Sequence, residues 1–388
     1  MTVAGDHVGF NFQLTDEMKM LRQTVRDFAE SEIKPHVMKF DESQEFPREI
    51  VRKMAELGFL GAMISPELSG AGLTSLEFVV IMEEIARVDP SVALTIAGHT
   101  GLCLQHISMF SNEHQARQYV PDLATGAKIG SWCLTESGSG SDASGMKTNA
   151  VLKGSMYALN GTKTFITNGS YAATFVVMAK TNTAKGKSGI SAFIVEKSFG
   201  GISVGKKENK LGMRASDTVQ LVFDNVPVPS QNLLGSEGEG FKQALAVLDR
   251  GRIGIAALAV GLAQGALEAA TRYAKERQQF GKAIAEFQGI QFSLAEMATE
   301  IAAARFLTYR AAEAKNRGQD INLLAAQAKL YASEVASRVA AAAIQIHGGY
   351  GFTKDYPVEK YYRDVKLLTI GEGTSEVQKI VIAKNLLR

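Results

Sequence analysis

Hydrophobic and polar positions follow helical spacing at both ends of the chain and strand-like spacing in its middle. Near the start, Thr15 can cap a helix that Pro35 should end. Apolar residues lie on one face of this helix: Met18, Leu21, Val25 and Phe28. A second helix is predicted for residues 75–88, because Asp89-Pro90 disfavours its continuation.

From about residue 130 to 235 the pattern changes to short β-type runs. Residues 156–159 and 162–166 flank Asn160-Gly161, a dipeptide typical of two-residue turns, so we expect a β-hairpin there. Further strands are predicted for residues 174–179, 190–195 and 219–223. Pro227 and Pro229 are expected to close this region.

Alanine-rich helical periodicity returns in residues 241–248, 252–277, 287–315 and 321–346, which indicates a helical bundle. The order along the chain is therefore α, then β, then α. We predict an α+β multidomain protein with an N-terminal helical domain (1–126), a middle β-domain (127–238) and a C-terminal four-helix-type bundle (239–388).

The composition is that of a globular protein with large cores: 388 residues, 46% of them hydrophobic and 21% charged. A net charge of +2 argues against a general nucleic-acid binder. Cys103 and Cys133 form no CxxC or metal-like spacing, so we expect buried free thiols and no metal.

The first twelve residues contain Asp6 and no arginine, unlike a signal peptide or a mitochondrial presequence. The apolar run 253–262 is too short to span a bilayer, which favours a buried helix. We therefore expect a cytoplasmic protein, or the mature form of an organellar one.

Glu372 is a lone carboxylate between Gly371 and Gly373, ahead of an amphipathic terminal helix. Ser375 and Gln378 have capping-box spacing, which places Glu372 just outside a helix N-terminus. Backbone that bends freely there suits a base that must reach a substrate. Taken alone, the glycines are more typical of an ordinary loop, with Glu372 a solvated or capping residue.

Two segments of the middle region could contact a flat or phosphorylated ligand. Residues 132–142 join a strand to glycines and hydroxyls, which suit phosphate, carbonyl or flavin edges, but they lack the GxGxxG form of a dinucleotide fold. Phe165 could stack on a ring beside the hydroxyl of Thr167; taken locally, a core position is the simpler interpretation.

The C-terminal region has further candidates. Glycines crowd a helix end at residues 348–351, more than a helix cap needs. Arg277 ends a long helix where its guanidinium could grip a diphosphate. Residues 249–252 could be a surface charge run or a ligand clamp; taken locally, a surface run is the simpler interpretation.

These segments, in this order, resemble the acyl-CoA dehydrogenase family over essentially the whole chain. The specific motifs are residues 133–142, 345–364 and 371–374, and residues 248–256 resemble the short-chain (butyryl-CoA) members most closely. The resemblance implies a homotetramer with non-covalent FAD, acting in fatty acid β-oxidation with an electron-transferring flavoprotein as partner.

The resemblance also implies roles for individual residues. Flavin contacts fall on Trp132, Leu134, Thr135, Ser141, Phe165, Thr167, Thr374 and Glu376. The pyrophosphate and adenine, across a subunit interface, fall to Arg277, Gln279, Phe280, Gln345, Gly348 and Gly349. Acyl-CoA contacts fall on Ser141, Asp249, Arg252 and Gly373.

The implied reaction is α,β-dehydrogenation of a short- or medium-chain acyl-CoA to trans-2-enoyl-CoA. Glu372 would take the α-proton while hydride leaves the β-carbon for flavin N5. The Glu372 N–H and a ribityl hydroxyl would hold the thioester carbonyl, where such donors stabilise the developing enolate.

Three positions depart from common family patterns. Gly371 replaces a frequent tyrosine, which leaves room for longer or branched chains. Gly251 stands where isovaleryl and long-chain members place their base, so Glu372 is the base candidate. Ala93 stands where glutaryl-type members have an arginine, so a dicarboxylate substrate is not expected.

Alternatives remain at this stage. A branched-chain acyl-CoA dehydrogenase, or a flavin oxidase or monooxygenase of the same fold, would share most of these motifs. A non-catalytic CoA- or acyl-binding protein would need the helical bundle alone.

Overall fold

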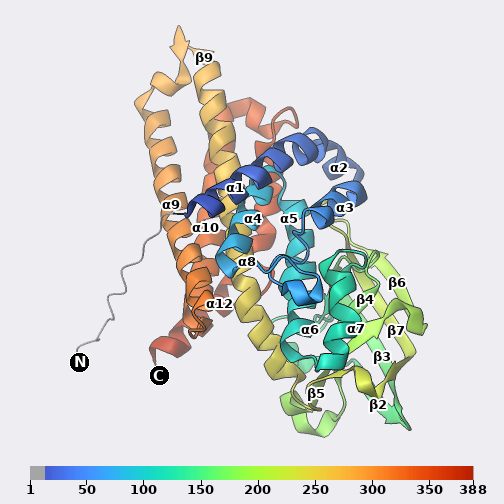
Figure 1. The fold of residues 1–388 in the computed structure, drawn as a ribbon. Helices are drawn as coiled ribbons and strands as arrows, with labels where there is room; N and C mark the ends of the chain where they lie inside the picture. Colours follow the sequence, from blue (N-terminus) through green and yellow to red (C-terminus); the bar gives the residue numbers. More distant parts are fainter. Residues whose placement is uncertain (1–13, 388) are drawn as a thin grey trace.

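The computed structural model describes residues 14–387 as long helices packed against one large sheet (Figure 1). The prediction about the first twelve residues lies outside this range. The N-terminal helices are α1 Asp16–Phe28, α2 Val37–Ser43, α3 Arg48–Glu56, α4 Ser75–Val88, α5 Pro90–Ile96, α6 Gln105–Phe110 and α7 Glu113–Ala124, with a π-helical segment, η4 Ala97–Leu104, before α6.

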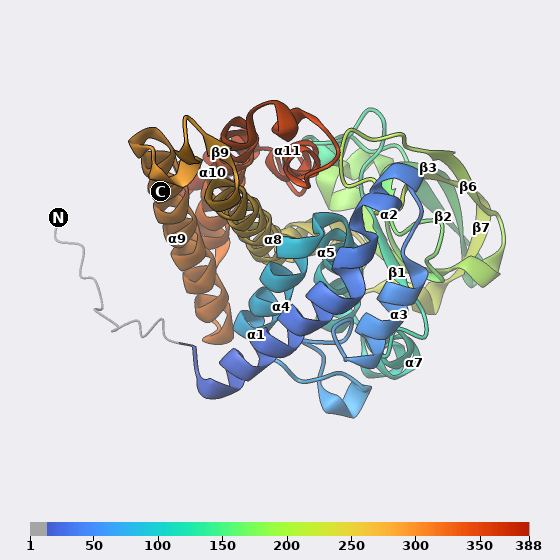
Figure 2. The ribbon, with the colours of Figure 1, turned by 90° about the horizontal axis from the view of Figure 1, so that it is seen from above.

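Both predicted N-terminal helices are confirmed. The Thr15 hydroxyl accepts the Met18 N–H at 3.2 Å and caps α1. α4 spans the predicted residues, and its start is a capping box between Thr74 and Glu77. All but two residues of α4 are buried, so this helix is part of the core and not a surface element. In Figure 2, α1 crosses over α4 and α5.

The middle region forms an eight-stranded sheet in the order β6-β7-β3-β2-β4-β5-β8, with β1 pairing parallel to β4. Its strands are β1 Gly130–Cys133, β2 Asn149–Lys153, β3 Met156–Thr167, β4 Thr174–Lys180, β5 Ile190–Glu196, β6 Ile202–Lys207, β7 Thr218–Pro229 and β8 Leu233–Leu234.

The predicted hairpin at Asn160-Gly161 is wrong. β3 runs straight through it, and the register against β7 shifts between Leu159 and Gly161. A Cβ on Gly161 would lie 2.3 Å from the Thr148 hydroxyl oxygen, so this glycine permits a close approach instead of a turn. The chain reverses earlier, at Gly154-Ser155 between β2 and β3. β7 likewise continues to Pro229, beyond the predicted end.

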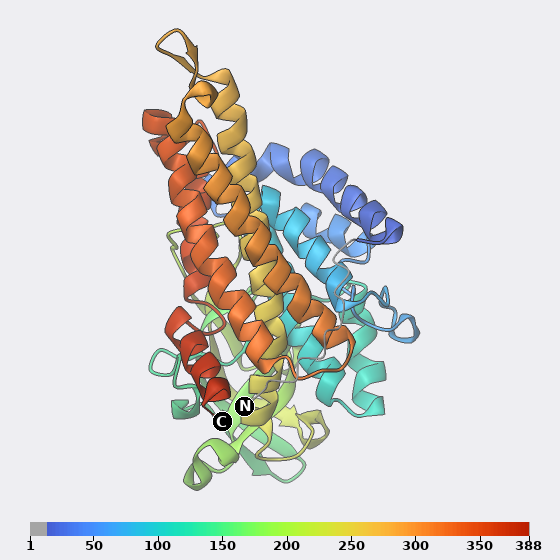
Figure 3. The same cartoon turned by 90° about the vertical axis from the view of Figure 1, so that its left-hand side faces the viewer.

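The C-terminal half is a bundle of long helices (Figure 3). They are α8 Gly240–Glu276, α9 Gln288–Asn316, α10 Asn322–His347, α11 Val358–Asp364 and α12 Ser375–Leu386. α8 is continuous through residues 249–251, where a break was expected. Among the described helices, α8 alone is long and apolar enough to cross a membrane; 78% of its apolar window is buried in the protein, as in a core helix.

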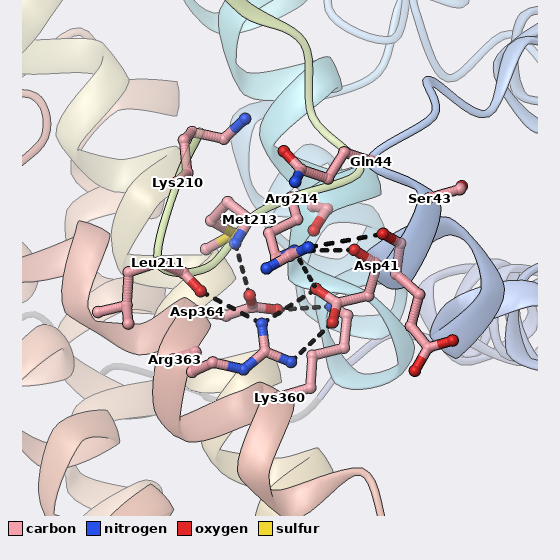
Figure 4. Close-up of polar contacts among 12 residues, drawn as sticks. Asp41, Ser43, Gln44, Lys210, Leu211, Met213, Arg214, Lys360, Arg363 and Asp364 are labelled. Carbon is pink, nitrogen blue, oxygen red and sulfur yellow. Dashed lines mark hydrogen bonds and ion pairs between the residues drawn. The ribbon is translucent and has the colours of Figure 1, made fainter. Parts of the chain in front are cut away.

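The three regions meet at a cluster of charged side chains (Figure 4). Arg363 of α11 donates to Asp41 of α2 at 2.7 Å, and the Arg214 guanidinium donates to the Asp41 carbonyl at 2.9 Å. Asp364 accepts the Met213 N–H at 2.5 Å. The loop after β6 is thereby fastened to both helical regions. Cys103 and Cys133 are buried free thiols, as predicted.

Candidate active site

Glu372 lies in a sharply bent loop between the 3₁₀ segment η11 Val365–Thr369 and α12. Its φ is +52°, a conformation rare for a residue with a side chain, and Gly373 follows with φ +95°. The predicted cap is shifted by one residue, because Thr374 and not Ser375 accepts the Val377 N–H. Ser375 instead donates to Glu334 at 2.6 Å.

Side chains of α10 and α12 hold this bent loop in place through hydrogen bonds. Lys329 of α10 donates to the Gly373 carbonyl at 2.6 Å. The Gln378 amide donates to the carbonyls of Glu372 and Gly373 at 3.3 and 3.0 Å. Gln378 therefore braces the loop, instead of closing the capping box that its spacing suggested. Such bracing can maintain a strained backbone at a functional site.

The Glu372 carboxylate is poised to exchange a proton near neutral pH. Its Oε2 is buried and has no hydrogen-bond partner among residues 14–387. Burial raises the pKa of Glu372 to about 7, and the nearby cations Lys329 and Arg252 limit that rise. A buried, unpaired carboxylate with such a pKa is a candidate general base.

α8 supplies the wall facing this carboxylate. Gly251 lies directly against it, and Leu102 of η4 borders the same space. Arg252 is 4% exposed and bonds Asp249 at 2.5 Å, while its Nε has no partner in the described chain. Asp249 also accepts the Asn322 amide at 3.0 Å to each oxygen. The charge run is thus a fixed, partly buried ion pair beside Glu372, and the surface interpretation is wrong.

The end of β1 and the loop after it form a second group of candidate residues. Trp132 and Leu134 are 9% and 8% exposed, and the Trp132 indole donates to His106 at 2.9 Å. Thr135 is half-buried, and Ser141 is exposed. The loop is anchored by Glu136, which accepts the N–H groups of Lys147 and Thr148 at 2.6 and 3.0 Å.

Phe165 is not a core residue. Its side chain is 64% exposed and its φ is +57°, so the strand turns this ring outward at an irregularity between Lys163 and Ile166. Thr167 is half-buried, and its side chain lies close to Gly98 of η4. The same π-helical segment reaches Gly251 through Leu102. η4 therefore lies next to both the end of β3, which carries Phe165 and Thr167, and the Glu372 loop.

A third group lies at the end of the bundle opposite the sheet, near β9 Gln278–Gln279 (Figure 1). The Arg277 guanidinium lies 5.6 Å above the Tyr350 ring, so the ends of α8 and α10 adjoin. The predicted members are exposed, apart from the partly buried Arg277: Gln279, Phe280, Gln345, Gly348 and Gly349. Within one chain these residues do not contact the Glu372 loop.

Sequence reasoning missed the residues that position the site. Lys163 is fully buried and donates to Glu136 and to the Leu134 carbonyl, both at 2.9 Å. Lys329 and Gln378 hold the Glu372 loop. Lys163 and Lys329 bond partners far away in sequence, and a lysine in a strand or helix carries no local sign of such a partner. The spacing of Gln378 from Ser375 did predict a hydrogen-bonding role, but the predicted bond was that of a capping box.

Comparison with known proteins settles the family. The family models described as the acyl-CoA dehydrogenase N-terminal, middle and C-terminal domains match residues 15–127, 131–226 and 238–387. The chain belongs to the acyl-CoA dehydrogenase family. It is therefore an oxidoreductase, and the predicted fold class is confirmed. The domain boundaries at 126/127 and 238/239 stay predictions.

Close relatives in this family cover almost the whole chain. A short-chain specific acyl-CoA dehydrogenase of Clostridium acetobutylicum is 48% identical over 97% of this chain and 100% of its own. Subunit CarC of the caffeyl-CoA reductase–Etf complex of Acetobacterium woodii is 44% identical over 96% of this chain and 99% of its own. The butyryl-CoA dehydrogenase structure from Megasphaera elsdenii has a TM-score of 0.96 and 42% identity, covering 98% and 100%.

Proposed function

We propose that this chain catalyses the FAD-dependent α,β-dehydrogenation of short- and medium-chain acyl-CoA thioesters to trans-2-enoyl-CoA. The observation that carries the proposal is the Glu372 carboxylate, with a buried, unpaired Oε2 and a pKa raised to about 7. A carboxylate of this basicity can take the α-proton of a thioester and is about half ionised at pH 7.

The residues present fit a flavin. The exposed Phe165 ring and Thr167 lie at the end of β3, where the Thr167 side chain adjoins Gly98 of η4. At Gly138 and Gly140 an added Cβ would meet nothing within 4 Å, so the loop leaves open space next to its backbone. When bound, FAD supplies the two-electron acceptor for the hydride that leaves the substrate's β-carbon.

We assign the flavin contacts of one subunit to two sets of residues. The ring and ribityl set is Trp132, Leu134, Thr135, Ser141, Phe165, Thr167, Thr374 and Glu376. The neighbouring subunit of a homotetramer would supply Arg277, Gln279, Phe280, Gln345, Gly348 and Gly349. Arg277 forms no ion pair within residues 14–387, which leaves its guanidinium available to a diphosphate.

Several groups of the chain would contribute to removal of the α-proton, each in a different way. In the described chain the Glu372 N–H makes no hydrogen bond, so it is available to donate to the thioester carbonyl as enolate charge develops. Lys329 and Gln378 keep this N–H and the carboxylate on one rigid loop. Arg252, fixed by Asp249, provides positive charge beside the acyl-CoA site, which Ser141 and Gly373 would border.

We further propose that electrons pass from this enzyme to an electron-transferring flavoprotein. The supporting observation is the 44% identity to a subunit of an Etf complex. The bacterial relatives favour a cytoplasmic location, with a mature organellar form as the alternative. No observation on this chain favours an oxidase or a monooxygenase over a dehydrogenase.

The test is an anaerobic visible spectrum of the purified protein before and after addition of butyryl-CoA. Bleaching of the flavin band with a long-wavelength charge-transfer shoulder supports the proposal. Glu372→Gln should keep bound flavin but lose this bleaching; full reduction in that variant would exclude Glu372 as the base. Rapid re-oxidation by oxygen with release of peroxide would indicate an oxidase instead.

A further inference from the structure

A series of hydrogen bonds holds the Trp132 side chain and connects four elements of the fold. The indole Nε1–H donates to Nδ1 of His106 on α6 at 2.9 Å. The other ring nitrogen of His106, Nε2, lies 3.1 Å from Oε1 of Gln243, near the start of α8. The Gln243 amide nitrogen donates to the Leu234 carbonyl of β8 at 2.9 Å. His106 therefore connects the end of β1 to the start of α8.

Only one assignment of protons satisfies all of these bonds. An indole nitrogen donates and cannot accept, so Nδ1 of His106 accepts and the ring proton lies on Nε2. Nε2–H then donates to the Gln243 oxygen, which leaves the Gln243 nitrogen for the carbonyl of β8. His106 is fully buried, and burial lowers its pKa to about 4. The ring is therefore neutral near neutral pH and keeps the lone pair that the indole requires.

A second buried histidine makes a different kind of bond to the same strand. His99 of η4 accepts the Gly130 N–H at 2.8 Å through Nδ1, and its Nε2 bonds the Leu123 carbonyl at 3.0 Å. A buried backbone N–H needs such a partner wherever it lies. The Trp132 indole is a side chain with several rotamers, so the position of its acceptor decides where the ring lies. His99 therefore supports the strand, whereas His106 selects the orientation of one side chain.

The orientation of Trp132 bears on how the proposed flavin site lies relative to the base. Trp132 packs in one core cluster with Leu104 of η4 and with Leu134, another assigned flavin contact. η4 lies against β1, and its Leu102 borders the space that the Glu372 carboxylate occupies. The indole is thus next to the helical segment that adjoins both the flavin-contacting strand and the base.

The loop after β1 has supports of its own. Lys163 donates to the Leu134 carbonyl and to Glu136, both at 2.9 Å. Glu136 in turn accepts the N–H groups of Lys147 and Thr148. Loss of the bond to His106 should therefore free the indole without releasing the loop, and bound flavin should be retained.

We propose that His106 is a positioning residue for flavin reduction: it holds the Trp132 indole against α6, which keeps the Trp132 side of the flavin site in a fixed position relative to Glu372. This inference rests on the proposed function, in which Trp132 contacts the flavin. His106 is not catalytic, because both of its ring nitrogens are engaged and its side chain is fully buried.

The test is a double-mutant cycle on the holoenzyme, measured as the limiting rate of anaerobic flavin reduction by butyryl-CoA. A misplacement of about 1 Å at a reacting centre costs about 10²-fold, so the partial loosening in His106→Leu should cost about tenfold. The butyryl-CoA concentration at half-maximal rate should stay within about twofold of the wild type. With Trp132→Phe already present, His106→Leu should lower the rate by less than about twofold, because no indole N–H remains to be held.

Two further variants separate the hydrogen bond from the bulk of the ring. His106→Asn carries an amide oxygen that can replace Nδ1 as acceptor, so it should recover most of the rate. His114→Leu, at an exposed position of α7, is the control and should leave the rate unchanged. If His106→Leu fails to bind flavin, His106→Asn is compared with His106→Gln, whose amide lies nearer the Nε2 position. The asparagine variant should then be the faster of the two.

Fluorescence gives a measurement that does not depend on activity. Trp132 is the only tryptophan of the chain, so the emission reports this position alone. The anisotropy of the wild-type holoenzyme should decay only with the tumbling of the whole protein. His106→Leu should add a nanosecond component, as for a side chain that has lost its fixed rotamer, and His106→Asn should not.

Several results would overturn this role of His106 while the proposed function stands. They are an equal loss of rate with and without Trp132→Phe, an unchanged rate in His106→Leu, and a change confined to the half-saturating concentration. Absence of the nanosecond component in His106→Leu would also overturn it, because the indole would then have another support. If neither butyryl-CoA nor octanoyl-CoA reduces the wild-type flavin, the proposed function fails, and this inference with it.

Discussion

A Cβ atom placed on Gly251 would lie 2.3 Å from Oε2 of Glu372, closer than any real contact of this kind. The proposed base therefore occupies the space that a side chain on α8 would otherwise fill. These two positions are separated by more than a hundred residues, yet each constrains what the other can be. A side chain at position 251 would have to displace the carboxylate of Glu372.

Gly251→Ala should consequently displace the Glu372 carboxylate. A shift of about 1 Å at the reacting group costs about 10²-fold in rate, so we expect a loss of that size in the anaerobic reduction rate with butyryl-CoA. Gly254→Ala on the same helix is the control, because its added Cβ would make an ordinary contact of 3.7 Å with Phe78. Equal rates in the two variants would show that Glu372 is not confined by Gly251.

The rate of flavin reduction should follow the ionisation of Glu372. The proposed base acts only when deprotonated, and burial raises its pKa to about 7. The reduction rate at low substrate concentration should therefore fall about tenfold for each pH unit below 7 and level off above it. Stopped-flow measurements from pH 5 to 9 check this. A plateau that extends down to pH 5 would mean that Glu372 is not the titrating group.

The raised pKa of Glu372 also predicts how this residue affects the free energy of unfolding. Since its pKa is about 7 in the folded chain and near 4.5 when unfolded, the folded state favours the protonated carboxyl. Stability from this group is complete below about pH 4.5 and is lost as the pH rises through 7. Glu372→Gln should then melt like the wild type at pH 4.5 and be about 1–3 kcal/mol more stable at pH 8.

Thermal melting of both holoenzymes at pH 4.5 and pH 8 provides the comparison. Glu296→Gln is the matched control, because that side chain is exposed on α9. A Glu372→Gln variant that is less stable than the wild type at pH 8 would contradict a desolvated carboxylate at this position.

The sequence predicted those features that depend on neighbouring residues, and it failed where the contacting residues lie far apart in the chain. α4 was predicted over its full length, because its apolar periodicity and Asp89-Pro90 are local signals; the structure adds the Thr74 and Glu77 capping box at its start. The Glu372 loop was also predicted, since flanking glycines and a following helix are local signals. The Asn160-Gly161 prediction was wrong because the glycine permits a close contact with Thr148, just before the neighbouring strand β2, and the local pattern does not contain this contact.

Long-range polar contacts explain the rest of the difference. Lys163 bonds Glu136 across 27 positions, and Lys329 bonds Gly373 across 44. A buried lysine appears in the sequence as a charge, where surface exposure is the usual interpretation. Arg250 of α8 and Lys315 of α9 are another such case, because they line one small cavity only in the folded chain.

Lys360 provides the last prediction, because it is a buried cation at the junction of the three regions. Its ammonium donates to Asp89 at 2.9 Å and to Asp364 at 2.5 Å, and all three side chains are at most 1% exposed. Asp364 in turn accepts the Met213 N–H, which ties this group to the loop of the middle region (Figure 4). Asp89 also caps α5 through the Ser91 N–H.

Removing this cation should therefore be costly. Lys360→Met leaves two buried carboxylates without their partner, and we expect the free energy of unfolding to fall by about 3–5 kcal/mol. Lys366→Met, on the exposed side of the following turn, should change it by no more than about 0.5 kcal/mol. Adding Asp364→Asn to Lys360→Met should restore part of the loss, since it removes one of the two uncompensated charges. Denaturant unfolding of the four proteins measures these differences. If Lys360→Met unfolds at the same denaturant concentration as Lys366→Met, the buried cluster does not hold the junction together.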